Sequence, residues 1–112
     1  MLIACNDLIS QGDCGLLRVE LFDDYCDGWT IYGAYIDVII NGSTIQTISL
    51  PSGCGPEAFL FPVDSGATVD LVYSTTFQNE HSYKVYDQFG VLLHEKTSMS
   101  SMKVLILCHL LC

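Results

Sequence analysis

Hydrophobic and polar residues alternate with a period of two along much of this chain. Between Leu17 and Leu21, for example, apolar side chains alternate with Arg18 and Glu20. Successive side chains of a strand point to opposite faces of a sheet, so this alternation predicts a strand with one buried face. The same period recurs at residues 36–40, 59–63 and 69–73, and we find no convincing apolar stripe of a helix. The pattern therefore predicts an all-β protein.

Glycine and proline divide these strands from one another. Asn41-Gly42 is the strongest hairpin signal, because both residues tolerate the positive φ of a type I′ turn. Further turn segments leave short strands at intervals of roughly 8 to 12 residues, the spacing of an antiparallel sandwich. These segments are residues 51–56, 64–66 and 87–90. We predict an antiparallel two-sheet β-sandwich of about eight strands, and the pattern leaves a jelly-roll and an immunoglobulin-like topology open.

Length and charge limit the kinds of partner. The chain has 112 residues, half of them hydrophobic, and a net charge of −9 at pH 7, which suits one domain with a substantial core. It has only four Lys and Arg residues and no basic cluster that could release counterions from a phosphate backbone, so we exclude nucleic acid as a partner. The apolar residues 104–112 are too few to cross a bilayer as a helix, and we expect no membrane span.

Cysteine is abundant for a chain of this length. The six cysteines have a spacing that matches no zinc pattern. Disulfides in an oxidising compartment are the better interpretation, which predicts a secreted or cell-surface protein. Cys14 and Cys54 each stand beside glycine at a predicted strand boundary. Spacing alone does not determine the connectivity, and Cys14 with Cys54 is the first pair that we predict.

An acidic loop follows the first long strand. Asp23, Asp24 and Asp27 lie within five positions, and carboxylates that close repel one another unless a turn, a cation or a partner compensates them. Clustered carboxylates are typical calcium ligands, so these three residues, joined by Glu80, are a candidate calcium site. The alternative is that aspartates before glycine bond their own backbone and stabilise a turn.

The same loop contains two aromatic residues that suggest carbohydrate binding. An exposed aromatic ring beside acidic groups is a common way for a sandwich protein to hold a sugar, which makes Trp29 and Tyr25 candidate binding residues. The alternative for Trp29 is a buried position in which the indole N–H donates to a backbone carbonyl, and burial habits favour it.

Catalysis finds little support, and one residue is a candidate for modification. His81, His94 and His109 have no neighbouring nucleophile, so we predict a protein that is not an enzyme and interpret His81 as a solvated strand residue. Asn41-Gly42-Ser43 is an Asn-x-Ser acceptor at a predicted hairpin tip, where a glycan would be tolerated.

Two separated motifs resemble one family. Residues 21–29, followed by residues 33–38 and Asn41-Gly42, resemble the Asp-Ser-Tyr-Gly-Asp-Gly-Trp-Asn-Gly module, and residues 79–90 are similar to its second signature, Glu-x-Ser-Tyr with a strand and a turn. That resemblance implies a β-sandwich of secreted and surface-displayed bacterial proteins of the adhesin and gliding-motility kind. Cys26 stands where the module usually has glycine.

The two ends lie outside this resemblance. We divide the chain into an N-terminal extension (1–13), the β-sandwich module (14–96) and an apolar C-terminal extension or last strand (97–112). The apolar side chains at both ends must be buried. They can form a strand of the chain's own sandwich, or a strand that is donated to the sheet of a neighbouring copy. The candidate assembly residues are Leu2, Ile3, Val104, Leu105, Ile106 and Leu107.

Two functions of different class follow from these patterns. The first is a structural subunit of an extracellular surface filament or adhesive fibre, in which the protein is its own partner in a homo-oligomer built through terminal strand or sandwich contacts. The second is a calcium-dependent carbohydrate- or surface-binding module of a larger adhesin. Calcium is the only cofactor that we predict.

Overall fold

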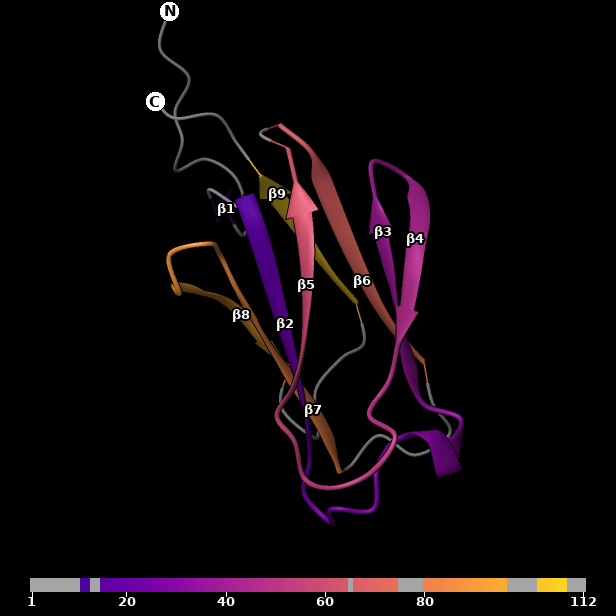
Figure 1. Cartoon of the computed structure of the whole chain (residues 1–112). Coiled ribbons are helices and arrows are strands. Elements are labelled where there is room, and N and C mark those ends of the chain that lie inside the picture. Colours follow the sequence, from indigo (N-terminus) through magenta and orange to yellow (C-terminus); the bar gives the residue numbers. More distant parts are fainter. Residues whose placement is uncertain (1–10, 13–14, 65, 75–79, 97–102, 109–112) are drawn as a thin grey trace, which may run out of the picture.

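The protein is a sandwich of two β-sheets. The computed structural model describes residues 11–12, 15–64, 66–74, 80–96 and 103–108. One sheet has the strand order β1-β9-β6-β3-β4 and the other has the order β5-β2-β7-β8 (Figure 1). The strands are β1 (Gln11–Gly12), β2 (Gly15–Asp23), β3 (Tyr35–Ile40), β4 (Ser43–Ile48), β5 (Glu57–Val63), β6 (Thr68–Ser74), β7 (His81–Tyr86), β8 (Leu92–Lys96) and β9 (Lys103–Cys108). The predicted all-β sandwich is confirmed.

Strand order distinguishes between the two topologies that the sequence left open. A jelly roll with strands B to I has the sheets B-I-D-G and C-H-E-F. If β2 is strand D and β7 is strand I, with β8 and β9 as B and C, the orders β9-β6-β3-β4 and β5-β2-β7-β8 are reproduced, and β1 is an additional edge strand beside β9. The chain therefore has the strand order of a circularly permuted jelly roll, and not that of an immunoglobulin domain.

The core lies between the sheets and follows the alternation in the sequence. In β2, Leu17, Val19 and Leu21 are fully buried, and in β6 Val69 and Leu71 face them with no exposed surface. The predicted hairpin is also present, because β3 and β4 pair antiparallel through Asn41-Gly42 and both turn residues have positive φ. One short 3-10 helix, η1 (Thr30–Tyr32), is the only helix in the described residues. It is not long enough to cross a membrane.

The apolar C-terminal segment is a strand of the sandwich itself. Residues Lys103 to Leu107 of β9 pair antiparallel with β6, and Ile106, opposite Val69, has no exposed surface. Of the two alternatives that the sequence left open for this segment, a C-terminal extension and a last strand, the structure therefore shows the last strand. An assembly role for Val104, Leu105, Ile106 and Leu107 stays a prediction. Leu2 and Ile3, the other candidate assembly residues, lie outside the described residues.

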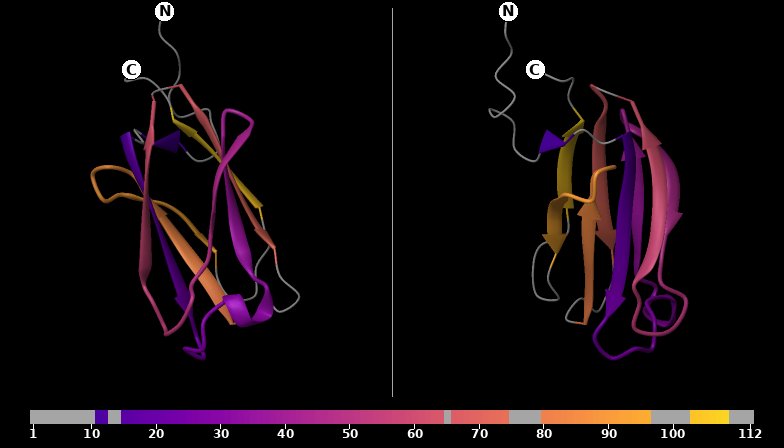
Figure 2. Two further views of the ribbon diagram at one scale, coloured as in Figure 1. Left: turned by 45° about the vertical axis from the view of Figure 1, so that its right-hand side comes forward. Right: turned by 60° about the vertical axis from the view of Figure 1, so that its left-hand side comes forward.

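The sandwich has two ends of different character. The β3–β4 and β5–β6 turns lie at one end, and the β2–β3 connection with η1 lies at the other, next to the β4–β5 connection (Figures 1 and 2). We call this second end, formed by residues 23–34 and 49–57 together with Glu80 and His81, the loop end. It contains most of the candidate site residues.

Candidate functional site

A disulfide and several backbone bonds join the two long connections of the loop end. Cys26 is bonded to Cys54, with the two Cα atoms 3.9 Å apart. The backbone N–H of Asp23 donates to the carbonyl of Cys54 at 2.9 Å, and that of Trp29 donates to Leu50 at 2.7 Å. The β2–β3 and β4–β5 connections therefore form one cross-linked unit.

The predicted pairing of Cys14 with Cys54 is wrong, because Cys54 pairs with Cys26. Cys14 itself lies outside the described residues. The glycine beside each of these cysteines indicates the end of a strand. It does not indicate which two loops lie at the same end of the sandwich, and the pairing depends on that. Cys26 has φ +60°, the left-handed conformation that glycine adopts most easily, and it occupies the position where the resembled module has glycine.

Close backbone approach also fixes the β4–β5 connection. Gly55 has φ +80°, and a Cβ atom there would collide with the carbonyl oxygen of Leu21 in β2. Gly53, two residues earlier, has a similar φ of +82° with open space around its Cα. Gly55 therefore needs glycine for its left-handed φ and for the close approach of Leu21, whereas Gly53 needs glycine for its left-handed φ alone.

Asp23 forms the turn that the sequence suggested as the alternative to a metal site. Its Oδ1 accepts a hydrogen bond from the backbone N–H of Tyr25 at 2.9 Å, as in an Asx turn. The side chain is only 3% exposed, since Asp23 continues the inward-facing positions of β2. Its Oδ2 is buried and has no hydrogen-bond partner among the described residues.

Asp23 belongs to a buried cluster of three metal-ligating side chains. Asp23 and His81 are direct partners across β2 and β7, and Glu80 immediately precedes β7. One ligand atom from each of Asp23, Glu80 and His81 lies within 4.8 Å of the others, and all three residues are buried. The structure therefore joins two of the predicted calcium ligands, Asp23 and Glu80, to a histidine. Asp24 and Asp27 are exposed on the loop and are not among these three ligands, although the carboxyl group of Asp27 lies close enough to that of Asp23 to interact with it.

The imidazole of His81 is held on several sides. Its Nδ1 lies 2.6 Å from the hydroxyl of Tyr73, and its Nε2 lies 3.5 Å from Oε1 of Glu80. The ring stacks on Trp29, with centroids 4.9 Å apart and planes 21° apart. Lys96, also buried, donates from Nζ to the carbonyl of His81 at 3.0 Å. These contacts fix the ring with Nε2 directed toward the two carboxylates.

Burial shifts the pKa of three side chains at this site, Asp23, His81 and Lys96. It raises the pKa of Asp23, an effect to which the neighbouring carboxylate of Asp27 adds. It lowers the pKa of His81, and the positive charge of Lys96 lowers it further, against the opposing effect of Asp23. Burial lowers the pKa of Lys96 as well. The environment thus favours a neutral imidazole, the form that binds a metal.

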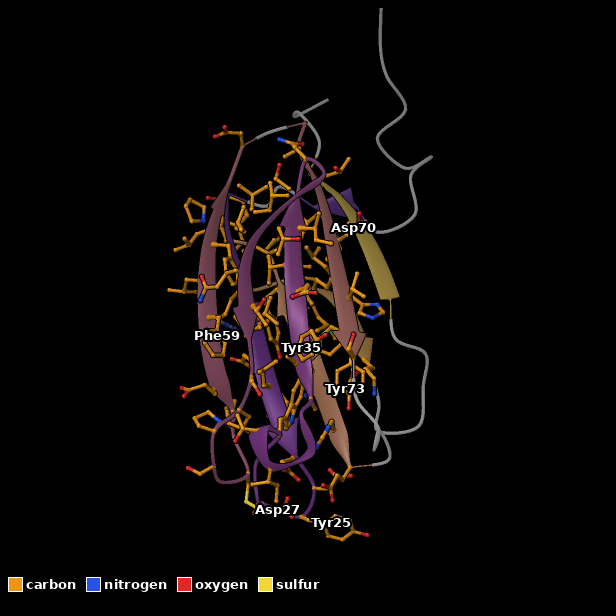
Figure 3. The ribbon with its side chains drawn as sticks, turned by 90° about the vertical axis from the view of Figure 1, so that its right-hand side faces the viewer. Tyr25, Asp27, Tyr35, Phe59, Asp70 and Tyr73 are labelled. Carbon is orange, nitrogen blue, oxygen red and sulfur yellow. A yellow bond between two sulfur atoms is a disulfide. The ribbon has the colours of Figure 1, made fainter. Side chains whose placement is uncertain are left out.

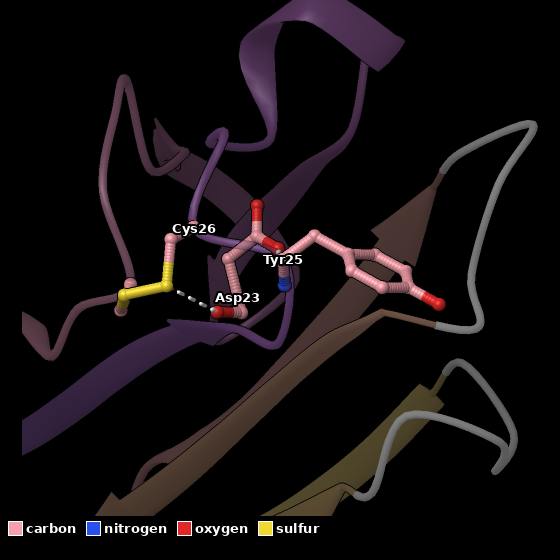
Figure 4. Close-up of a disulfide and its surroundings, with 4 residues drawn as sticks. Asp23, Tyr25 and Cys26 are labelled. Carbon is pink, nitrogen blue, oxygen red and sulfur yellow. Dashed lines mark hydrogen bonds between the residues drawn. A yellow bond between two sulfur atoms is a disulfide. The ribbon is translucent and has the colours of Figure 1, made fainter.

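Trp29 and Tyr25 have opposite surroundings. Trp29 is fully buried and its indole Nε1 donates to the carbonyl of Phe22 at 3.0 Å, so the core alternative is confirmed and its ring has no surface to offer a sugar. Tyr25 is 71% exposed and Ile31 is 66% exposed. Figure 3 shows Tyr25 projecting away from the body of the sandwich at the loop end, close to Asp27. Figure 4 shows its ring directed away from the disulfide, whose Cys26 Sγ lies 3.7 Å from the carbonyl oxygen of Asp23.

Two residues of the site were missed from the sequence. His81 was interpreted as solvated, which is wrong because it has no exposed surface. Its position in the alternation was a usable signal, since His81 has the same parity as the buried Tyr83 and Val85. Lys96 had no such signal, because the neighbouring positions of β8 are exposed or half-buried.

Asn41, the predicted glycosylation residue, is exposed at the hairpin turn on the far end of the sandwich. Its Oδ1 accepts a hydrogen bond from the backbone N–H of Thr68 at 3.1 Å. Glycosylation there stays a prediction.

Comparison with known proteins adds no relative. No family model matches the chain, and neither the curated proteins nor the solved structures contain a match. The resemblance to the adhesin-type module therefore stays a prediction based on the two motifs.

Proposed function

We propose that this chain is a non-catalytic extracellular module that binds carbohydrate at the loop end. The observation that carries the proposal is the placement of Tyr25, which is largely exposed on a loop that Cys26–Cys54 cross-links. A tyrosine on a loop whose backbone is restrained offers its ring to a ligand at a low cost in conformational entropy. The disulfide is compatible with a secreted protein.

Exposed carboxylates beside Tyr25 complete a sugar-binding surface. Asp24 and Asp27 flank the tyrosine and are exposed. Their oxygens can accept hydrogen bonds from sugar hydroxyl groups while the ring packs against the apolar face of the sugar. The net charge of −9 and these carboxylates repel acidic sugars. We therefore expect neutral or amino sugars as ligands, and not sialylated or sulfated ones.

A glycan array tests this proposal with three forms of the oxidised protein. The wild type should bind a subset of neutral or amino sugars, and Tyr25→Ala should lose that binding. Phe89→Ala is the matched control, because Phe89 is 72% exposed in the β7–β8 turn, at the other end of β7. Equal binding by wild type and Tyr25→Ala would refute the role of the loop end, and so would the absence of any bound glycan.

A second candidate is the structural subunit of a surface filament or adhesive fibre. The apolar strand β9 no longer supports it, because β9 is paired within its own sheet. The observation that favours it is β4, which lies at the edge of its sheet, is exposed from Ser43 to Thr47, and contains neither a charged residue nor proline. Such an edge can pair with a second copy of the chain, although a bulge near Ile45 shortens its regular part.

The two candidates differ in the state of the purified protein. A filament subunit should form long particles in negative-stain micrographs, and Gln46→Lys should disperse them by placing a charge on the exposed edge of β4. A binding module should remain dispersed particles of about 12.4 kDa in both forms. Filaments that persist in Gln46→Lys would rule out β4 as the contact.

A further inference from the structure

We infer that Asp23, Glu80 and His81 form a binding site for a divalent transition-metal ion, such as zinc, and not for calcium. The inference goes beyond the proposed carbohydrate binding, which involves Tyr25 on the surface of the same end. It rests on the mixed donor set, on the buried Oδ2 of Asp23, and on the fixed orientation of His81.

The donor set selects the metal. Calcium takes six to eight oxygen ligands, whereas the cluster offers two carboxylates and one imidazole nitrogen. Zinc binds nitrogen and carboxylate oxygen with about four ligands in all, and three protein ligands with one open position are a common set. The imidazole of His81 beside the two carboxylates therefore favours a transition-metal ion over calcium.

The spacing of the donors fits such an ion. Nε2 of His81 and Oε1 of Glu80 are 3.5 Å apart, which is longer than an ordinary N–H···O hydrogen bond. With zinc–ligand bonds of about 2.1 Å, two ligands at tetrahedral angles are about 3.4 Å apart. All three donor atoms lie within 4.8 Å of one another, so small side-chain movements would bring Asp23 to the same distance.

Asp23 supplies an independent observation that points to a cation. Its Oδ1 accepts the Tyr25 N–H, whereas the buried Oδ2 accepts a hydrogen bond from no donor among the described residues. The neighbouring carboxyl group of Asp27 adds negative charge there and no positive partner. A carboxylate oxygen that is buried without a partner carries a desolvation cost. A cation at the centre of the cluster would remove that cost, because its charge is opposite to that of the carboxylates of Asp23 and Glu80.

Tyr73 completes the arrangement as a positioning residue. A histidine that binds metal through one ring nitrogen usually donates its other N–H to an oxygen, which fixes the tautomer and the ring orientation. In this structure Nδ1 of His81 is 2.6 Å from the Tyr73 hydroxyl. That contact assigns Nδ1 as the donor when the metal is bound, and leaves the lone pair of Nε2 for the ion.

Isothermal titration of the full-length oxidised protein with Zn²⁺, and separately with Ca²⁺, tests the inference. We expect one zinc ion per chain, no saturable calcium binding, and a loss of zinc affinity of at least about tenfold in His81→Gln and in Asp23→Asn. His94→Gln is the matched control, because His94 is the other described histidine and lies on β8 away from the cluster; it should bind zinc as the wild type does. Tyr73→Phe, which keeps the ring, should weaken zinc binding by roughly 10-fold.

Cobalt provides a readout that requires no variant. Co²⁺ added to the wild type should give the intense visible absorption of a four-coordinate ion, and Zn²⁺ should remove it. Tight calcium binding, zinc binding that His81→Gln leaves intact, or the weak absorption of six-coordinate Co²⁺ would each overturn the inference. If the variants do not fold, the cobalt spectrum of the wild type decides.

Discussion

Asp23 and His81 are direct partners across β2 and β7, and both are buried where these strands reach the loop end. A carboxylate and an imidazole in this position would form an ion pair if both were charged. Burial instead raises the pKa of Asp23 and lowers that of His81. Desolvation therefore disfavours the charged form of each partner, and the pair sits beside the aromatic rings of Trp29 and Tyr73.

Acidification should destabilise the protein through His81. Because the pKa of His81 is lowered in the native state, the unfolded chain takes up this proton first. Its contribution to stability is therefore lost as the pH falls from about 6.5 toward the native pKa. The raised pKa of Asp23 has the opposite effect on stability. As the pH falls toward the ordinary value of 3.8, the native state binds this proton before the unfolded chain does, which favours the native state. Urea unfolding between pH 7.5 and 5 should show a steeper loss for the wild type than for His81→Gln.

The control for this experiment is His94→Gln. Burial also lowers the pKa of His94, so this variant should remove a separate part of the pH dependence and leave the part due to His81. The groups that act on the His81 charge are Asp23, Lys96, Asp27 and Asp24, and all are retained in the control. Identical pH slopes for the wild type and His81→Gln would contradict the assignment.

Two neighbouring glycines should respond differently to alanine. Gly53→Ala should cost roughly 1 kcal/mol, because an L-residue disfavours its left-handed conformation but meets no neighbour. Gly55→Ala should cost roughly 2 to 4 kcal/mol, because its Cβ also collides with the Leu21 carbonyl of β2. Chemical unfolding of both variants measures the difference, and equal costs would show that the β4–β5 connection can move away from β2.

Strand β9 should be essential to the fold. This strand pairs with β6 and buries Ile106, so we expect a deletion of residues 104–112 to unfold the protein. Ile106→Ala should destabilise it by about 2 to 5 kcal/mol, as for other fully buried aliphatic residues. A cooperative thermal transition at an unchanged temperature in Ile106→Ala would contradict the placement of β9.

Alternation predicted the strands well because it depends only on neighbouring residues. Each strand with one buried face, such as β2 or β6, repeats its pattern within a few positions, and Asn41-Gly42 encodes its own turn. The same parity places Asp23 and His81 on the inward face, so the burial of both was available in the sequence. The sequence leaves β9 open between an extension and a last strand, because a family resemblance, and not the pattern, sets the boundary of the sandwich.

The cluster and the disulfide depend on information that no short segment contains. Asp23 meets His81 only because β2 pairs with β7, strands that are far apart in the chain. Cys26 meets Cys54 only because the β2–β3 and β4–β5 connections both cross between the sheets at the same end of the sandwich. Sheet order therefore had to be known before either contact could be predicted.

The Cys26–Cys54 disulfide should contribute to carbohydrate binding at the loop end as well as to the stability of the fold. Closing a loop between residues separated by 28 positions contributes about 3.5 kcal/mol in the chain-entropy model. We expect Cys26→Ser with Cys54→Ser to lose about that much stability and also to weaken carbohydrate binding, because Tyr25 is then less restricted in the free protein. Sugar binding at full strength in a folded double variant would show that the cross-link does not preorganise the loop.

The most direct test of the central claim, carbohydrate binding at the loop end, is a chemical-shift titration. The ¹⁵N-labelled oxidised protein is titrated with the oligosaccharide that binds best on the array. We predict saturable shifts at the amides of Tyr25, Asp24, Asp27 and Ile31, with the hairpin turn at Asn41 unaffected. Shifts confined to the outer sheet face around Tyr35 and Ile45, or no saturable shift with any neutral or amino sugar, would contradict the account.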